Sequence, residues 1–372
     1  MTDFAELNPP QRLLLGPGPS PVHPQVQRAM AAPSLGHLDP ELLRLLSETS
    51  ELLRYAFQTK NELTLAVSGT GMAGMECVLG NLIEPGDCLV VGVAGFFGAR
   101  VAELAERMGA RVRRVECEWG RDLGFDPLAA AIKEETPKAV AIVHAETSTG
   151  VLQPMDEIGE LVHRYDSLLI VDCVTSLGGA PVTIDAWDAD AAFSGSQKCL
   201  GCPSGLAPVT VSERFRNAVK KRTTPVHSFY LDLELLCRYW LGDHLYHHTI
   251  SAPLVYALHE GLRLVKEEGL VDRWARHRSN AELLWNGLER LGLELHVPRV
   301  RRVASLTTVR VPDGVDEAAV RVKLRDDYGI EIGAGLGPLK GKIWRIGLMG
   351  HGSQPANVAL LLAALGQILG RD

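Results

Sequence analysis

The chain has 372 residues, of which 46% are hydrophobic and 22% charged, and its formal net charge at pH 7 is −7. This composition excludes a largely disordered chain, and the length predicts a large domain together with a smaller one. Basic residues cluster only briefly, at 111–114 and 220–222, which argues against a nucleic-acid partner, because such proteins need a broad stripe of Lys and Arg.

Short apolar runs alternate with longer amphipathic stretches in the first half of the chain. Runs bounded by turn residues predict strands, and apolar residues at helical spacing predict helices. The alternation indicates a doubly wound, largely parallel sheet in an α/β domain. The expected strands are Val90–Val93, Arg111–Val115, Ala139–Val143 and Ser167–Val171, with further apolar runs at Leu63–Val67 and Ala191–Phe193 and helices at Ala99–Met108 and Met155–Tyr165.

The pattern changes after about residue 250, where long helical stretches predominate. We interpret this part as a smaller α+β domain that a long helix joins to the first. The large domain then covers 21–255 and the small one 256–372. The expected helices are Ala252–Glu268, Val271–Leu291, Glu317–Tyr328 and Pro355–Leu369, and the expected strands are Ala304–Val311 and Ile343–Gly347.

Two polar segments follow predicted strands at their carboxyl ends, where ligands bind in open α/β sheets. Asp172 ends one strand, and the loop Glu146-Thr-Ser-Thr-Gly150 follows another. A carboxylate at such a position costs free energy unless something pairs with it. Asp172 is therefore either a helix cap or salt-bridge residue, or the partner of a cation such as a protonated pyridine nitrogen.

A glycine-rich segment, Ser68-Gly-Thr-Gly-Met-Ala-Gly74, lies between an apolar run and a helical stretch. Free N–H groups at a helix N-terminus can bind a phosphate. The spacing matches neither the Walker A motif nor the dinucleotide fingerprint. The segment is thus an anion site or an ordinary tight turn.

Two cations stand out by their surroundings. Lys198 ends the polar segment Ser194-Gly-Ser-Gln-Lys198, and Arg345 lies within a predicted strand between apolar neighbours. Taken alone, each residue is best explained as an exposed charge. A lysine with a lowered pKa can nevertheless attack carbonyls, and the arginine fork fits a substrate carboxylate.

Histidines and cysteines give no metal or redox motif. His244, His247 and His248 lack acidic or thiol partners at ligand spacing, and Cys199 and Cys202 stand beside the lysine loop without a second pair. We expect no metal site. The seven cysteines, the lack of an export signal and the lack of a membrane-spanning stretch predict free thiols in a cytoplasmic protein without a membrane partner.

Taken together, segments from one end of the chain to the other resemble the alanine–glyoxylate/serine–pyruvate branch of the class V aminotransferases, which depend on pyridoxal 5′-phosphate (PLP). The resemblance implies the PLP-transferase type I (aspartate-aminotransferase-like) fold, with residues 1–20 as an arm over the active site. The motifs that carry it are Leu14-Leu-Gly-Pro-Gly-Pro-Ser20, Phe57-Gln-Thr-Lys-Asn61, Ser68-Gly-Thr-Gly71, Glu84-Pro-Gly-Asp87, Ser148-Thr-Gly-Val-Leu-Gln-Pro154, Val171-Asp-Cys-Val174, Ser194-Gly-Ser-Gln-Lys198, Tyr246-His-His-Thr249 and Arg345-Ile-Gly-Leu-Met-Gly350.

The resemblance also implies roles for individual residues. Lys198 would form a Schiff base with PLP and move a proton between the substrate Cα and the cofactor, and Asp172 would pair with the ring nitrogen. Arg345 would bind the substrate carboxylate, with Gly18 lying over the site. The other implied contacts are Phe97, Thr147 and Val174 at the ring, Thr70, Gly71, Met72 and Gln197 at the phosphate, and Tyr246 and Thr249 at the phosphate from the second subunit of a homodimer.

The implied reaction is ping-pong amino transfer from alanine or serine to glyoxylate or pyruvate. Two positions depart from the family pattern: Met72 stands where histidine is usual, and Phe97 where tryptophan is common. Other donors therefore stay open, namely ureidoglycine, 2-aminoethylphosphonate, hydroxykynurenine and pyridoxamine. A class V desulfurase would need a cysteine on a mobile loop, and a non-catalytic PLP carrier would not need Lys198, Asp172 and Arg345 together.

Overall fold

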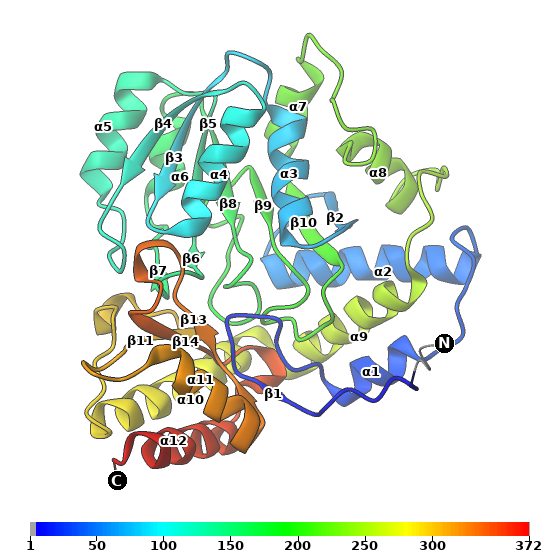
Figure 1. The fold of residues 1–372 in the computed structure, drawn as a ribbon. Coiled ribbons are helices and arrows are strands. Elements are labelled where there is room, and N and C mark those ends of the chain that lie inside the picture. The colour runs from blue at the N-terminus through cyan, green and yellow to red at the C-terminus, as the bar shows by residue number, and fades with distance from the viewer. Residues whose placement is uncertain (1–4, 372) are drawn as a thin grey trace.

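The computed structural model describes residues 5–371, and its largest feature is a seven-stranded sheet in the order β2-β10-β9-β8-β5-β3-β4 (Figure 1). Neighbouring strands are parallel except that β10 runs antiparallel to both β2 and β9. The sheet is therefore mostly parallel, as the sequence predicted. Its strands are β2 (Leu63–Ser68), β3 (Cys88–Val93), β4 (Arg111–Glu116), β5 (Ala139–Val143), β8 (Leu168–Asp172), β9 (Ala191–Phe193) and β10 (Leu206–Val211).

The strands differ in composition according to their place in this sheet. All residues of β5 and β8 are buried, because helices cover both faces of a parallel sheet and leave no wet side for an alternating pattern. By contrast, β4 lies at the edge, where Arg111, Arg113 and Glu116 are exposed, Val112 and Arg114 are half-buried and only Val115 of the strand is buried. The charged edge discourages pairing with another chain. The short basic cluster 111–114 is thus a solvated strand face.

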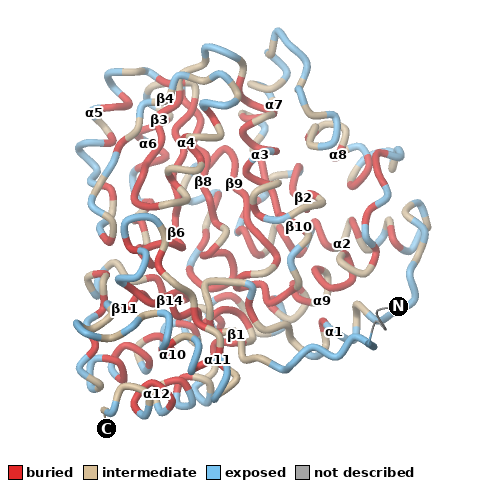
Figure 2. Tube along the Cα trace, in the orientation of Figure 1, coloured by how far each residue is buried: buried red, intermediate tan, exposed pale blue. Residues whose placement is uncertain are grey.

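Helices pack around the large sheet and enclose one continuous hydrophobic core (Figure 2). Helix α2 lies along α9 and β2, whereas α4 packs on β3 and β4. A two-stranded ribbon, β6 (Ala145–Glu146) with β7 (Val151–Leu152), extends from the end of β5. The helices are α1 (Pro24–Met30), α2 (Pro40–Phe57), α3 (Gly71–Leu82), α4 (Phe96–Arg107), α5 (Phe125–Glu135), α6 (Ile158–His163), α7 (Glu213–Lys220), α8 (Leu233–Trp240) and α9 (Ala252–Glu268).

The C-terminal part has its own core, which is built around the buried rings of Trp285 and Trp344. Its antiparallel sheet has the order β11-β14-β13, and helices flank it in Figure 1. The bounds are α10 (Leu270–Arg290), β11 (Leu306–Arg310), α11 (Glu317–Tyr328), β12 (Ile330–Glu331), β13 (Gly333–Ala334), β14 (Ile343–Gly347) and α12 (Pro355–Leu369), with single 3₁₀ turns at Arg299–Arg301, Gly337–Leu339 and Gly350–Gly352.

The N-terminal segment crosses from the first part of the chain to this second core. Strand β1 (Leu13–Leu14) pairs in parallel with β12, and the Leu15 side chain is fully buried in the C-terminal core. The segment therefore lies where it can reach both parts of the molecule. Residues 1–4 and 372, at the ends of the predicted arm and of the predicted small domain, lie outside the described residues.

Two predicted helices have different bounds in the structure. Helix α4 begins three residues earlier than predicted, at Phe96. The reason is that the Glu146 carboxylate accepts hydrogen bonds from the backbone N–H groups of Phe97 and Gly98 in its first turn. Helix α6 is shorter than predicted at both ends, and at its start Glu157 (φ 66°) has a left-handed backbone that interrupts helical geometry. No described helix is both long and apolar enough to cross a membrane.

Candidate active site

The predicted acid and lysine meet at the carboxyl edge of the large sheet. Asp172 is the last residue of β8 and is 4% exposed, and Lys198 lies in the loop after the neighbouring strand β9 and is 8% exposed. The two segments are tied together where they leave the sheet, because Cys173 N–H donates to Phe193 O at 2.8 Å and Ser194 Oγ donates to Cys173 O at 3.1 Å. These bonds fix the backbone from which the Asp172 and Lys198 side chains extend.

Burial favours the uncharged form of both groups, so it raises the pKa of Asp172 and lowers that of Lys198. Removal from water raises the pKa of Asp172 to about 7, although the N–H of Val174 donates to its carboxylate at 2.8 Å and opposes the shift. Removal from water also lowers the pKa of Lys198 to about 8. A lysine with this pKa supplies a neutral, nucleophilic amine near physiological pH, which a surface lysine does not.

The N-terminal segment covers Lys198 directly. The Lys198 Nζ donates a hydrogen bond to the carbonyl of Pro17. Gly18 has φ +110°, and a Cβ there would lie 2.7–2.9 Å from the Lys198 side-chain carbons and nitrogen. Only glycine fits this approach, so the predicted Gly18 contact with the site is present in the described residues.

Arg345 reaches the same edge from the C-terminal sheet. It lies in β14 and is 8% exposed, and its guanidinium donates to Ala334 O at 2.6 Å and to Thr147 O at 3.2 Å. Burial lowers the pKa of Arg345 to about 10, and within residues 5–371 no carboxylate pairs with it within 4.0 Å. A buried cation without an anion is costly, so the site is prepared for an anionic ligand.

The glycine-rich turn forms the N-terminus of α3. Thr70 is the N-cap residue, yet its exposed side chain makes no capping hydrogen bond and is free to bind a ligand together with the N–H groups of the first turn. A Cβ on Gly71 would lie 3.1 Å from a Val174 methyl group, so this turn adjoins the segment that follows Asp172. Met72 is half-buried beside Gly71.

Gln197 adds a second unused polar group. Its Oε1 is buried and has no hydrogen-bond partner in the described part of the chain. An amide oxygen only accepts and so calls for a donor, whereas a phosphate dianion, which also only accepts, would bind the Nε2 group of the same amide. Since Gln197 directly precedes Lys198, it lies where the resemblance expects a phosphate contact.

Glu146 is a site residue whose role the sequence did not reveal. Its buried carboxylate accepts from the N–H groups of Phe97 (3.1 Å), Gly98 (3.2 Å) and Ser148 (3.0 Å). A Cβ on Gly95 would lie 2.5 Å from Glu146 Cγ, so glycine is needed for this approach. Glu146 therefore fixes the start of α4 and with it the backbone of Phe97.

The remaining predicted contacts fall into two groups. Thr147 is buried and its hydroxyl bonds to that of Thr175, and Val174 is half-buried beside Asp172. Tyr246 (59% exposed) and Thr249 lie at the surface of the protomer instead. His248, between them, bonds to Ser68 at 2.8 Å, so their segment passes the start of the glycine-rich turn.

The histidines and the two loop cysteines have ordinary structural partners. His247 and His248 bond to each other through Nδ1 at 2.8 Å, and residues 5–371 contain no group of three or more potential ligands able to hold a metal ion. Cys199 Sγ donates to Thr175 O and Cys202 Sγ to Ala257 O, so the two thiols have separate backbone acceptors and are not paired with each other.

Together these groups fit PLP. The cofactor needs an amine for its aldehyde, an acid for its ring nitrogen and donors for its phosphate. The described residues offer Lys198 as the amine, Asp172 as the acid, and the N–H groups of the α3 N-terminus with the Nε2 group of Gln197 as donors. Arg345 remains for a substrate carboxylate. The buried acid, amine and guanidinium are costly without a ligand, which is the expected sign of a binding site.

Comparison with known proteins supports the same assignment. The family model described as aminotransferase class-V matches residues 22–341. The (S)-ureidoglycine–glyoxylate transaminase of Bacillus subtilis is 42% identical, with 99% of this chain and 93% of that protein covered. The alanine–glyoxylate aminotransferase of Callithrix jacchus is also 42% identical, with 98% and 89% covered. A crystal structure of alanine–glyoxylate aminotransferase from Nostoc sp. is 49% identical, covers 99% of this chain and 97% of that one, and has a TM-score of 0.97.

Proposed function

Because this chain belongs to the aminotransferase class-V family, we propose specific residue roles and a specific substrate pair for it. The protein is a PLP-dependent aminotransferase with the PLP-transferase type I fold, and it moves an amino group from a small amino acid to a small 2-oxo acid. Bound PLP supplies an electron sink for the electrons released at the substrate Cα. The chain must supply binding, orientation and proton transfer.

In the proposed mechanism, Lys198 and Asp172 perform the chemistry at the cofactor. With PLP bound, Lys198 would be the residue that holds the cofactor, and its amine would also be the base that takes the proton from the substrate Cα. The Asp172 carboxylate keeps the proton on the ring nitrogen. Glu146 orients Phe97 through its backbone, and Phe97 would then lie against the ring. Thr70, the Gly71 and Met72 backbone and Gln197 would bind the phosphate, while Thr147 and Val174 contact the ring.

The observation that carries the substrate proposal is the buried guanidinium of Arg345, which has no carboxylate of the described chain within 4.0 Å and interacts with the buried Glu146 only at longer range. A substrate α-carboxylate would provide the missing charge. We therefore propose an α-amino acid donor, alanine first and serine second. Glyoxylate is the proposed acceptor, because the relatives from Bacillus subtilis and Callithrix jacchus are both named for it.

The substrate proposal predicts a sharp effect of carboxylate recognition. Alanine added alone should remove the visible absorption band of the bound cofactor, and ethylamine, which lacks the carboxylate, should not at the same concentration. Arg345→Met should raise the alanine concentration for half-maximal bleaching roughly 10- to 100-fold, the value of a charge-assisted bond pair, and leave ethylamine unchanged. Stopped-flow absorbance measures both amines. If Arg345→Met raised the concentration needed for bleaching by the same factor for alanine and for ethylamine, the proposed role of Arg345 would be contradicted.

Ureidoglycine is the second candidate donor. It also carries an α-carboxylate, so Arg345 suits it as well, and the Bacillus subtilis transaminase named for it is as similar as the alanine enzyme of Callithrix jacchus. The same bleaching measurement with each donor separates them. If neither alanine nor serine removes the band but ureidoglycine does, the first proposal is wrong and the second replaces it.

A homodimer with shared sites is part of the proposal. Tyr246 and Thr249 are exposed in the protomer, whereas a phosphate-binding role requires that they approach a site. A second subunit would bring them to the phosphate of its neighbour, as in an isologous dimer. The seven cysteines are unpaired in the described chain, which supports the cytoplasm as the compartment.

Mixing two inactive variants tests the shared site. A Lys198→Ala chain lacks the amine, and a Tyr246→Phe/Thr249→Ala chain lacks the phosphate contacts. In a mixed dimer one site combines the intact Lys198 of one chain with the intact Tyr246 and Thr249 of the other. Refolding an equal mixture should therefore restore about a quarter of the wild-type activity, since half of the dimers are mixed and each has one complete site. If mixing restores nothing, each site lies within one chain.

The domain boundaries complete the proposal. We assign 21–255 to the large PLP-binding domain and 256–372 to the small domain, with 1–20 as the arm. The separate hydrophobic cores support two domains, and the Pro17 and Gly18 contacts with Lys198 support the arm. The first core continues past residue 255, because α9 packs in it as far as Val265.

A further inference from the structure

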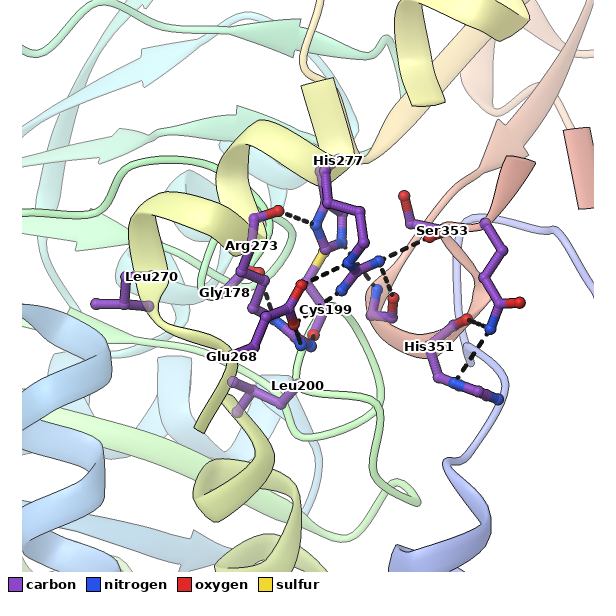
Figure 3. Close-up of polar contacts among 12 residues, drawn as sticks. Gly178, Cys199, Leu200, Glu268, Leu270, Arg273, His277, His351 and Ser353 are labelled. Atoms are coloured by element: carbon purple, nitrogen blue, oxygen red, sulfur yellow. Dashed lines mark hydrogen bonds and ion pairs between the residues drawn. The ribbon is translucent and has the colours of Figure 1, made fainter. Parts of the chain in front are cut away.

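A buried arginine on α10 binds the backbone of the segment that follows Lys198 and of the segment that follows Asp172. Arg273 is 6% exposed, and its guanidinium donates to Cys199 O at 2.6 Å and to Gly178 O at 2.9 Å (Figure 3). Cys199 directly follows Lys198. Gly178 lies in the turn that follows Asp172, where Leu177 N–H donates back to Cys173 O. One side chain therefore bridges the lysine loop and the aspartate loop.

Glu268 holds this arginine in place and couples it to the C-terminal part. Its carboxylate pairs with Arg273 at 2.6 Å and with Arg276 at 2.5 Å. Arg276 in turn donates to Gly350 O at 3.1 Å and Ser353 O at 2.7 Å, in the segment that follows β14. Glu268 is the last residue of α9, and Gly269 (φ +82°) turns the chain so that both arginines on α10 can reach the Glu268 carboxylate.

His277 adds a fixed, uncharged link in the same network. It is fully buried, and burial lowers its pKa to about 3, so the ring is neutral at physiological pH. Because Gly350 N–H donates to Nε2 at 3.0 Å, the ring proton must be on Nδ1, from which it reaches Arg273 O at 2.8 Å. The segment after β14 is thus fixed to the backbone of Arg273 itself.

Hydrogen bonds must confine the lysine loop on this side because packing is incomplete there. Leu200 and Gly201 line a cavity of about 440 Å³ together with Arg273, Glu268 and Arg276. Side chains that face a cavity restrain their neighbours less than a filled core does. On this side the bond from Arg273 to Cys199 O restrains the loop after Lys198, in addition to the bond from Ser20 Oγ to Lys198 O at 2.7 Å on the side of the N-terminal segment.

We propose that Arg273 is a positioning residue for Lys198, which it holds against Asp172 by binding the carbonyls of Cys199 and Gly178. Glu268 and His277 orient Arg273 and connect it to the segment after the strand of Arg345. This inference rests on the proposed role of Lys198 as the cofactor-binding amine. It assigns to the α9–α10 junction a task that neither domain core requires.

The two arginines offer a matched pair of variants. Arg273→Met and Arg276→Met each remove one cation from Glu268, while the other arginine still neutralises it. They differ at the carbonyls, because Ser353 O also accepts from Asn280 Nδ2 at 2.9 Å and Gly350 O from Ser353 N–H at 3.3 Å, whereas Cys199 O and Gly178 O accept from Arg273. Only Arg273 touches the residue after Lys198. A purely structural role predicts a lower Tm for Arg273→Met with kcat per folded enzyme and Lys198 labelling unchanged, whereas positioning predicts that both change.

Two readouts follow Lys198 itself. In the cofactor-free protein, acylation of Lys198 by an amine reagent, followed by mass spectrometry, should be roughly 10-fold faster in Arg273→Met, because a loosened loop opens more often. In the holoenzyme with alanine and glyoxylate, kcat should fall roughly 10- to 100-fold, the cost of a misplaced catalytic group, while KM for alanine stays within about threefold because Arg345 is unchanged. Arg276→Met should resemble the wild type in both, and Arg273→Lys should be intermediate.

The outcomes separate clearly. A kcat of Arg273→Met within about threefold of wild type overturns the proposal, and so does a lower kcat with unchanged labelling of Lys198, since the loss would then arise elsewhere. Equal effects of the two methionine variants overturn it as well. If Arg273→Met does not fold, Arg273→Lys against Arg276→Lys decides by the same criteria. Labelling needs no substrate, so a wrong donor would leave this test intact.

Discussion

Lys198→Ala should lower the rate of amino transfer by roughly 10⁴-fold or more, because the variant loses both the covalent attachment of PLP and the base for the substrate Cα. The side chain is 8% exposed, lies under Pro17 and Gly18, and has a pKa lowered to about 8 by burial. These properties describe an amine prepared to react. Rates with alanine and glyoxylate measure the loss, and borohydride reduction followed by peptide mass analysis should find PLP on Lys198 in the wild type only.

Two controls separate the amine from the charge. Lys198→Arg keeps a cation but offers no neutral amine, so it should be as inactive as Lys198→Ala. Lys220→Ala removes an exposed lysine at the end of α7 and should leave activity unchanged. Borohydride-stable PLP on a different lysine, with Lys198→Ala still active, would exclude Lys198 as the attachment site.

The predictable part of the fold is the part in which local sequence and tertiary role agree. Strands β5 and β8 are continuous apolar runs because both faces are covered, and Asp172 ends β8 where the ligand edge lies. Strand β10 was not predicted. It contains Pro208, which lacks an N–H and is unusual in a strand with neighbours on both sides, so its sequence does not resemble that of a central strand.

The site residues divide in the same way. Lys198, Asp172 and Arg345 could be singled out because a family resemblance joins three otherwise unremarkable charges, and the structure brings them to one edge. Glu146 and Arg273 could not be found in this way. Their partners are backbone groups about 50 and 70 or more positions away in the chain, and no side-chain pattern encodes such a contact. The clue was indirect for Glu146, whose approach needs the glycine at Gly95.

Asp172→Asn should have opposite effects on catalysis and on the stability of the cofactor-free protein. With PLP bound, the buried carboxylate would pair with the ring nitrogen, and breaking a buried pair costs about 3–5 kcal/mol, which, if lost from the transition state, corresponds to a roughly 10²- to 5 × 10³-fold lower turnover. Without PLP, burial raises the pKa of Asp172 to about 7. The ionised carboxylate is then disfavoured in the folded chain relative to the unfolded chain, where it has its ordinary low pKa.

The sign of this stability effect follows from proton linkage. Between the ordinary pKa of an aspartate and about 7, the folded chain binds more protons at this position than the unfolded chain, so its contribution to the free energy of unfolding falls as pH rises. Asparagine stays neutral and can still accept from Val174 N–H through its Oδ1. Thermal unfolding of the cofactor-free proteins should therefore show a higher Tm for Asp172→Asn, with a larger difference at pH 7.5 than at pH 5. A lower Tm at pH 7.5 would mean that Asp172 is stabilised by the fold rather than held for a cationic ligand.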